Sequence, residues 1–357
     1  MTLNAPTVPF DPAHIRSTVE RLLYEFLDQQ ELAASDVGEV ALFTGLLRDM
    51  IAAGGKRVRP VLCVTGWQAV RDDPPPPVVY RVAASIELFH AFALIHDDIM
   101  DNSGTRRGRP TAHRALATHH KDRPDADALG VNAAILLGDL ALGWSYEVLH
   151  GSEAAPEALT AVWPVLNAMR TETLTGQYLD LTAAGNATAN LETAWRIIRY
   201  KTAKYTIERP LHIGAILAGA TREQLGALSA YALPLGDAFQ LRDDLLGVYG
   251  DPGSTGKSSL DDLREGKHTV LIATALHRAT PSDRRVLRRL LGDPELDREG
   301  AEQIRHILTA RGARAAVEDL LTGRCEQALA SLDTAPLQPA ATARLHHLAL
   351  SLTRRDG

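Results

Sequence analysis

The clearest structural signal in this 357-residue chain is the stretch at residues 87–109, ELFHAFALIHDDIMDNSGTRRGR. Its first half is apolar and ends in acidic residues, of which Asp97 and Asp101 stand four positions apart. On an α-helix this spacing puts both carboxylates on one face, one turn apart. His90 lies seven positions before Asp97, on nearly the same stripe. Two aligned carboxylates favour a bound cation, and magnesium takes carboxylate oxygens while sharing substrate phosphates.

A second acidic segment strengthens the case for magnesium, because a DDxxD pattern alone is common on exposed helices. In residues 239–244, FQLRDD, the side chains of Gln240, Asp243 and Asp244 can share one side of another helix. One arginine guanidinium can bind two phosphate oxygens at once, through two of its N–H groups. Basic motifs accompany the acidic ones: GGKRVRP at 54–60, RRGR at 106–109, KT at 201–202, TGK at 255–257 and GK at 266–267. The combination favours one diphosphate site with three magnesium ions over two solvated helix faces.

The composition indicates a large helical core. Hydrophobic residues make up 45% of the chain and aromatic residues 5%, so Ala, Leu, Val and Ile fill most of that core. The net charge of −6 argues against nucleic acid as a general partner. Two cysteines, Cys63 and Cys325, are too few for a disulfide framework and fit a reducing compartment. We recognise no signal peptide and no apolar run of membrane length, and therefore expect a cytoplasmic protein without stable membrane insertion.

The hydrophobic spacing predicts helices along nearly the whole chain and no convincing strand. Residues 1–12 are expected to form a loose arm, and residues 13–357 a single all-α domain of about a dozen helices. Residues 102–112 are expected to be irregular, and residues 251–268 a functional loop. Pro210 is expected to break or kink the helix that precedes it. Besides the helix that carries Asp97, helices are predicted over residues 14–32, 38–53, from 59, 131–149, 159–181, 191–209, 211–220 and 224–247.

With these motifs in order, the chain resembles the trans-isoprenyl diphosphate synthases of the polyprenyl synthetase family, most closely the short-chain geranylgeranyl type. So many ordered motifs are a specific match. They are GGKRVRP at 54–60, HDDIMD at 96–101, RRGRP at 106–110, GQYLD at 176–180, KT at 201–202, FQLRDD at 239–244 and TGKSSLDDLREGK at 255–267. The resemblance implies an isoprenoid-synthase helical bundle around a central cavity, usually as a homodimer.

The resemblance also implies a magnesium-dependent, head-to-tail condensation of isopentenyl diphosphate with an allylic diphosphate. Stabilising the departing diphosphate is an electrostatic task for metal ions and fixed cations. The implied metal ligands, for three expected ions, are Asp97, Asp98, Asp101, Asp243 and Asp244. Arg106, Lys201, Lys257 and Lys267 are implied to bind the allylic diphosphate, and Lys56, Arg59, His90 and Arg107 isopentenyl diphosphate. Catalytic roles are expected for Asp97, Asp101, Asp243, Lys201 and Gln240, with Thr202 and Gln240 beside the reacting carbons.

One position departs from the family pattern, because Gly247 stands where the second acidic motif usually has its third aspartate. Asp251, Asp261 or Asp262 is expected to help through water. Asp180 is expected either to pair with a nearby lysine or to orient metal ligands. His96 is expected to be a polar residue at the pocket edge, and Arg57 a surface charge.

Product length is expected to depend on the side chains that precede Asp97. Helical geometry places Ala93 and Phe89 nearest the Asp97 stripe, whereas the family pattern assigns length control to Ala93 and Phe92. A single bulky residue there resembles enzymes that make geranylgeranyl diphosphate (C20), with farnesyl diphosphate (C15) as the alternative. A terpene cyclase needs no second diphosphate site and is disfavoured by GGKRVRP and His90. A non-catalytic partner subunit is the other rival, and Gly247 is its only support.

Overall fold

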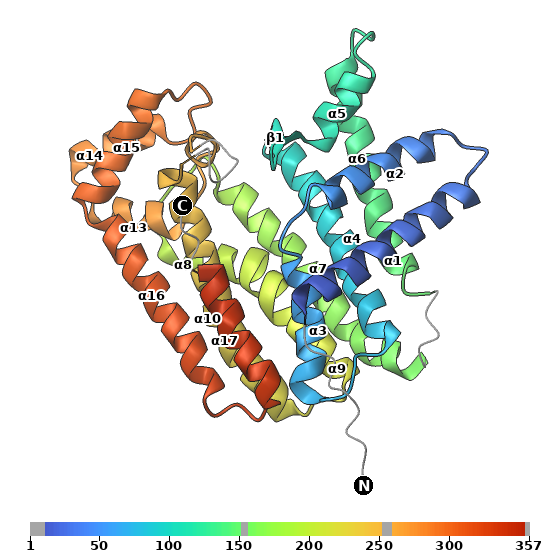
Figure 1. Cartoon of the computed structure of the whole chain (residues 1–357). Coiled ribbons are helices and arrows are strands. Elements are labelled where there is room, and N and C mark those ends of the chain that lie inside the picture. Colours follow the sequence, from blue (N-terminus) through green and yellow to red (C-terminus); the bar gives the residue numbers. More distant parts are fainter. Residues whose placement is uncertain (1–10, 151–155, 252–258, 354–357) are drawn as a thin grey trace. The chain divides into compact units, whose positions relative to one another are not determined.

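Helices make up nearly all the regular structure of residues 11–150, 156–251 and 259–353, which the computed structural model describes (Figure 1). The all-α prediction is confirmed. The chain forms two units, Met1–Ala161 with Gly214–Ala218 and Val162–Ile213 with Gly219–Gly357. The expectation of a single domain stays a prediction, and so does that of a loose arm at residues 1–12, most of which lies outside the described residues.

The helix that carries the first acidic motif, α4 (Pro77–Met100), is the centre of the first unit. Twelve of its residues are buried, from Val79 to Asp98, and it packs against α1, α3, α5 and α6. The side chain of Asp11 caps α1 by accepting a hydrogen bond from the Ala13 amide at 2.8 Å. The other helices of this unit are α1 (Pro12–Ala33), α2 (Glu39–Ala52), α3 (Val58–Val70), α5 (Ala112–His119) and α6 (Ala126–Glu147).

Two helices of the first unit, α4 and α6, are long and apolar enough to cross a membrane by length and composition. The expectation that no apolar run reaches that length is therefore wrong. The two helices differ in burial, since 61% of the apolar segment of α4 is buried but only 28% of that of α6. A largely buried apolar helix is the normal core helix of a globular protein.

A small hairpin interrupts the segment that was expected to be irregular. Strands β1 (Thr105–Arg106) and β2 (Arg109–Pro110) pair antiparallel, with Arg106 opposite Arg109. The two turn residues, Arg107 at φ 52° and Gly108 at φ 73°, are both left-handed. Two consecutive positive φ values are typical of the tight turns that join antiparallel strands. The hairpin thus fixes the direction in which the arginines of RRGR leave the backbone.

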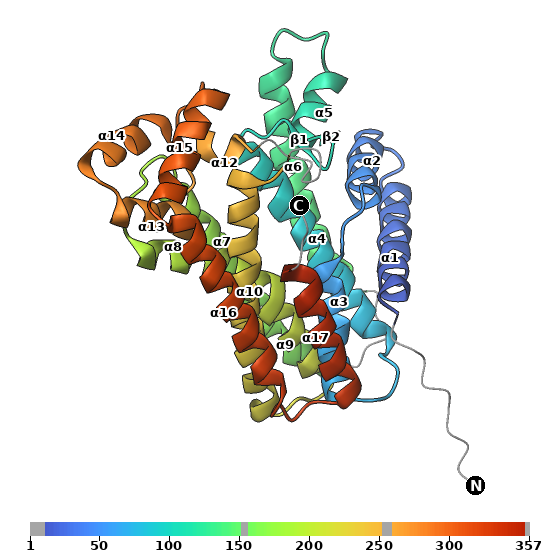
Figure 2. The same cartoon turned by 60° about the vertical axis from the view of Figure 1, so that its left-hand side comes forward.

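The second unit is organised around α10 (Arg222–Tyr249), which carries the second acidic motif. A capping box between Thr221 and Gln224 starts this helix. It packs against the π-helix η1 (Ile198–Glu208) and against α16 and α17, as Figure 2 shows for the latter two. The remaining helices, of which α7 begins and α9 ends in residues of the first unit, are α7 (Pro156–Ala183), α8 (Leu191–Ile197), α9 (Arg209–Leu217), α12 (Asp261–Arg264), α13 (Val270–Arg278), α14 (Pro281–Leu290), α15 (Arg298–Ala310), α16 (Ala313–Leu332) and α17 (Pro339–Thr353).

The break expected at Pro210 does not occur, because the chain stays helical through this proline, whereas the alternative, a kink, stays a prediction. The chain passes there from the π-helix directly into α9, whose second residue is Pro210. Because a proline nitrogen carries no hydrogen, this position lacks a backbone hydrogen bond to the preceding turn. Glycines bring two helices close to η1. A Cβ on Gly176 of α7 would collide with the Lys201 backbone, and one on Gly236 of α10 would collide with Ala203. The π-helix that carries Lys201 is therefore held by direct backbone packing on two sides.

Candidate active site

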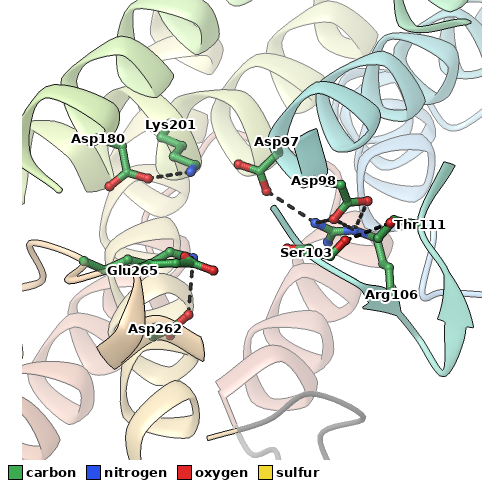
Figure 3. A network of polar contacts seen from close by, with 10 residues as sticks. Asp97, Asp98, Ser103, Arg106, Thr111, Asp180, Lys201, Asp262 and Glu265 are labelled. Atoms are coloured by element: carbon green, nitrogen blue, oxygen red, sulfur yellow. Dashed lines mark hydrogen bonds and ion pairs between the residues drawn. The ribbon is translucent and has the colours of Figure 1, made fainter. Parts of the chain in front are cut away.

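The acidic end of α4 is bound by the hairpin (Figure 3). The Nε of Arg106 donates to both carboxylate oxygens of Asp98 at 2.9 Å, and its Nη2 lies 3.3 Å from Oδ2 of Asp97. Asp98 is 2% exposed, so this contact offsets the cost of burying its charge. Burial alone would lower the pKa of Arg106, but its hydrogen bond to Asp98 and the nearby carboxylates raise it. Asp97 and Asp101 remain half-buried at the last turn of the helix.

A cluster of arginines surrounds His90, one to two turns earlier on α4. Nη1 of Arg59 lies 3.1 Å from Nε2 of His90. Since a guanidinium only donates, this nitrogen accepts and the ring proton is on Nδ1. Burial first, then the charges of Arg59, Arg107, Arg106 and Arg57, keep the pKa of His90 well below its usual value. His90 is therefore neutral in a strongly positive environment, which suits a polyanion that binds without metal.

The loop that carries GGKR divides its two basic residues between solvent and core. Lys56 is exposed, as a ligand-binding residue requires. Arg57, expected to be a surface charge, is only 6% exposed, and its guanidinium contacts Glu20, Glu87 and the Ile51 carbonyl. That expectation is wrong, and periodicity could not have corrected it because the loop has none. Both Arg57 and the neighbouring Arg107 have left-handed backbones, at φ 46° and φ 52°.

The second unit joins its motif residues in a chain of hydrogen bonds. Oγ1 of Thr202 donates to Oε1 of Gln240 at 2.6 Å, and Nε2 of Gln240 donates to Oδ1 of Asp244 at 2.8 Å. Nζ of Lys201 lies 2.6 Å from Oδ2 of Asp180, which realises the lysine pairing expected for that aspartate (Figure 3). The motifs GQYLD, KT and FQLRDD thus lie together, although up to about 60 residues separate them in sequence.

Asp244 is buried among other acids. Burial is the main cause that raises its pKa to about 8, the hydrogen bond from Gln240 opposes the shift, and the charges of Asp262, Asp243 and Asp180 add to it. Asp243 is half-buried beside it. Burial, and after it the neighbouring acids, therefore favour the protonated form of this carboxyl.

The gap in the second motif is filled from elsewhere in the same unit. A Cβ built on Gly247 would collide with Oδ2 of Asp262, at the start of α12. Nζ of Lys267 lies 3.2 Å from Oδ1 of Asp262 and 2.9 Å from Glu265. The segment 251–268, expected to be a loop, therefore contains the short helix α12. This helix places the Asp262 carboxylate at the position that the Cβ of an aspartate at 247 would occupy. Lys257 lies outside the described residues.

These acids suit magnesium by their chemistry. The donors are all carboxylate oxygens, which hard divalent cations prefer, and the mutual repulsion around Asp244 is what a cation would relieve. In residues 11–150, 156–251 and 259–353 no three His, Cys, Asp or Glu side chains converge closely enough to form a ready metal cluster. Arg106 and Lys267 instead neutralise Asp98 and Asp262. In each unit the carboxylates fit magnesium by their chemistry, and Asp98 in the first unit and Asp262 in the second are paired with cations of the chain.

The expected length-determining residues line one side of α4. Phe89 and Phe92 are buried, with ring centroids 5.4 Å apart, whereas Ala93 is half-buried. The ring of His96 packs edge-on against Phe92 at 4.8 Å, and its Nε2 lies 3.2 Å from the Ile135 carbonyl of α6. His96 therefore lies between two helices and backs the ring of Phe92.

Comparison with known proteins agrees with the motifs. The family model described as Polyprenyl synthetase matches residues 40–308. The short chain isoprenyl diphosphate synthase of Methanocaldococcus jannaschii is 33% identical over 261 residues, which are 73% of this chain and 74% of that protein. The geranylgeranyl diphosphate synthase of Saccharolobus solfataricus is 31% identical over 261 residues, 72% of this chain and 74% of that protein.

A solved structure extends the similarity over almost the whole chain. The geranylgeranyl pyrophosphate synthase of Corynebacterium glutamicum, complexed with isoprenyl diphosphate and magnesium, is 40% identical with a TM-score of 0.92. The match covers 97% of this chain and 100% of that chain. The chain belongs to the polyprenyl synthetase family and is a prenyltransferase.

Proposed function

We propose that this chain is a magnesium-dependent geranylgeranyl diphosphate synthase that joins isopentenyl diphosphate head-to-tail to allylic diphosphates. The observation that carries the proposal is the set of arginines around neutral His90, apart from the carboxylates that suit metal ions. One diphosphate must leave and needs metal, while the other must stay and needs cations alone. A synthase requires both kinds of site, whereas a terpene cyclase requires only the first.

The isopentenyl diphosphate site is assigned to Lys56, Arg59, His90 and Arg107. Opposite charges about 4 Å apart attract by roughly 4 kcal/mol at an effective dielectric near 20. The neutral His90 adds a directed hydrogen bond and no further charge. The C–O bond of this diphosphate is not allylic and would give an unstabilised cation, so fixed cations that bind the diphosphate are sufficient and no metal is needed to help it leave.

The allylic diphosphate site is assigned to Arg106, Lys201, Lys257 and Lys267. Three magnesium ions are proposed, with Asp97, Asp98, Asp101, Asp243 and Asp244 as their ligands. When bound, these ions neutralise the charge that develops on the departing diphosphate. Arg106 is already oriented by Asp98, and Lys201 by Asp180, so neither cation needs to be ordered when substrate arrives.

Gln240 and Thr202 are proposed to face the reacting carbons. Their mutual hydrogen bond and the bond to Asp244 fix the amide orientation. The carbonyl dipole of a fixed amide can stabilise a nearby carbocation without trapping it, which a carboxylate would do. No protein base is assigned, and the departing diphosphate takes the proton. A Gln240→Leu variant with an unchanged single-turnover rate would remove Gln240 from the chemistry.

A C20 product is proposed because two aromatic rings, Phe89 and Phe92, occupy α4 before Asp97. The buried pair would limit how far an allylic tail extends along that helix. Ala93, which is small, would leave room for intermediate lengths. The floor of the pocket is therefore assigned to Phe92, Phe89 and Ala93 together.

A cytoplasmic homodimer is proposed as the working form. α6 is apolar yet mostly uncovered, and Ile135 and Leu136 are 40% and 60% exposed. A second copy of the chain would cover this face without any membrane. Sedimentation of the purified protein tests the assignment, since a monomer at working concentrations would contradict it.

The decisive experiment is product analysis of the purified protein. It is incubated with magnesium, isopentenyl diphosphate and, in turn, the C5, C10 and C15 allylic diphosphates, with EDTA as the control. A metal-dependent C20 diphosphate supports the whole proposal, whereas a C15 end point keeps the reaction and rejects the length. Cyclised hydrocarbons without use of isopentenyl diphosphate would favour a cyclase, and binding without turnover a non-catalytic subunit.

A further inference from the structure

Arg57 connects three helices of the first unit from inside the core. Its Nη1 donates to Oε1 of Glu87 on α4 at 2.8 Å, and its Nε donates to Oε1 of Glu20 on α1 at 3.1 Å. A third bond goes to the carbonyl of Ile51 in the last turn of α2. The Arg57 side chain is 3% exposed and that of Glu87 is 8% exposed. Charges so deeply buried hold their geometry only because each is paired.

The loop that contains Arg57 adopts an unusual backbone. Gly54, Gly55 and Arg57 have φ values of 77°, 135° and 46°. A left-handed backbone is costly for a residue with a side chain and persists only where the surroundings impose it. Here the guanidinium bonds to Glu87 and Glu20 impose it. Arg57 is also the residue at which the loop enters α3.

A second arginine holds the same loop from the solvent side. Arg107 donates to the carbonyl of Gly54, and its guanidinium lies so close to Gly55 that a Cβ there would be 2.8 Å from Nη1. Arg107 is itself one of the residues assigned to isopentenyl diphosphate. The loop is thus held between a buried arginine and a ligand-binding arginine.

These contacts determine where the ligand-binding groups lie. Lys56 precedes Arg57, and Arg59 follows it by two residues in the first turn of α3, where it contacts His90. Glu87 is one helical turn before His90 on α4. The Arg57–Glu87 bond therefore ties the loop that presents Lys56 and Arg59 to the helix turn that presents His90.

We propose that Arg57, with Glu87 as its partner, is a positioning residue that sets the isopentenyl diphosphate site without touching the ligand. Its assignment rests on the proposed function, because that function gives Lys56, Arg59, His90 and Arg107 their ligand. Displacing a binding group by about 1 Å can weaken its contribution on the order of a hundredfold. A side chain that only stabilised the fold would affect both substrates alike or neither.

The test compares the KM values for the two substrates. Arg57→Met removes the charge, whereas Arg57→Lys keeps a charge that can reach one carboxylate. Glu87→Gln keeps the shape of the partner residue, and it tests the pair if Arg57→Met folds poorly. Arg48→Met is the matched control, since Arg48 also bonds two carboxylates, Asp28 and Glu31, but lies outside the loop. Each variant is assayed with one substrate saturating and the other varied, and its thermal midpoint is recorded.

The expected result is a KM for isopentenyl diphosphate raised on the order of tenfold or more in Arg57→Met and Glu87→Gln, with the allylic KM within about twofold of wild type. Arg57→Lys should recover part of the loss, and Arg48→Met should change neither KM. An unchanged isopentenyl diphosphate KM, or an equal rise in both, overturns the proposal. If the wild-type protein fails to condense the substrates, the proposed function is wrong. In that case the Kd of isopentenyl diphosphate, measured by calorimetry for the wild type and the same variants, replaces its KM. A Kd unchanged in Arg57→Met and Glu87→Gln overturns the proposal.

Discussion

Arg106 donates through Nε to both carboxylate oxygens of Asp98, at 2.9 Å each, and so one arginine of the hairpin is fixed by the middle residue of the first acidic motif. The pair explains how Asp98 can be only 2% exposed, because the guanidinium compensates for the burial of its carboxylate. Among the three aspartates of HDDIMD proposed as metal ligands, Asp98 is the one that also orients a cation of the chain, while Asp97 and Asp101 remain half-buried.

Breaking this pair from the arginine side should destabilise the protein strongly. Arg106→Met leaves the Asp98 carboxylate buried without its partner, and the free energy of unfolding should fall by about 3–5 kcal/mol. Adding Asp98→Asn to that variant removes the stranded charge and should recover much of the loss. Urea unfolding of the single and double variants measures both effects. A double variant no more stable than Arg106→Met would show that the carboxylate is not the cause.

Loss of a proposed metal ligand should abolish turnover without unfolding the chain. Asp97→Asn should lower kcat on the order of a hundredfold or more, because neutralisation of the departing diphosphate is weakened. Asp139→Asn is the control, since that acid is 61% exposed on α6. EDTA should abolish the wild-type rate and magnesium should restore it. Equal activity of the two variants would exclude Asp97 as a ligand.

The raised pKa of Asp244 predicts how stability depends on pH in metal-free protein. The folded chain holds this proton up to about pH 8, whereas the unfolded chain releases it at about pH 4, the ordinary pKa of an aspartate. The stabilising effect is therefore complete below about pH 4 and is lost as the pH rises toward 8, by up to about 1.4 kcal/mol per pH unit. Asp244→Asn should flatten this dependence in denaturant unfolding measured in EDTA. A profile unchanged by the substitution contradicts the assignment.

The space at Gly247 is already taken by Asp262. Gly247→Ala should therefore displace the Asp262 carboxylate from Lys267 and destabilise the protein by about 1 kcal/mol, although Ala normally favours a helix over Gly. Gly226→Ala in the same helix is the control, since a Cβ there meets nothing within 4 Å and should stabilise by up to about 1 kcal/mol. Thermal unfolding distinguishes them. Restoring the family aspartate at 247 should succeed only when Asp262 is shortened to Gly.

Product length should respond to the two phenylalanines before Asp97. Phe92→Ala and Phe89→Ala should each shift the product beyond C20, because each opens space on the Asp97 helix. Either change should also cost about 3–5 kcal/mol of stability. Phe26→Ala is the matched control, since Phe26 packs on Trp144 at 6.1 Å elsewhere in the same unit. Chromatography of the prenyl products gives the answer, and unchanged lengths in both variants would refute the floor assignment.

The helices and the two acidic motifs could be predicted from sequence because each depends on spacing within one helix. The α-helical repeat alone is enough to predict that Asp97 and Asp101 share one face. The other site residues could be predicted because the motifs resemble those of the family in their order. The burial of Arg57 could not be predicted, since it depends on Glu20 and Glu87 reaching one point from two other helices. A charged side chain in a loop is normally exposed to solvent, but Arg57 is buried because it pairs with Glu20 and Glu87.

Two further differences have the same origin. The π-helix at residues 198–208 keeps the chain helical up to Pro210, and nothing in the hydrophobic repeat distinguishes it from an α-helix. The carboxylate that fills the place of the missing aspartate comes from Asp262, fifteen residues beyond Gly247 in the numbering. Both features are set by contacts between segments, which local spacing does not record.

The π-helix between Gly176 and Gly236 limits how this part of the gene can change in length. Loss of one residue would return the segment toward the α-helical repeat and move the side chains near the deletion off the faces they now occupy. Thr202 would then turn away from Gln240, and the backbone packing on both glycines would be lost together. Single-residue deletions in residues 198–208 should therefore impair the protein more than substitutions at the same positions.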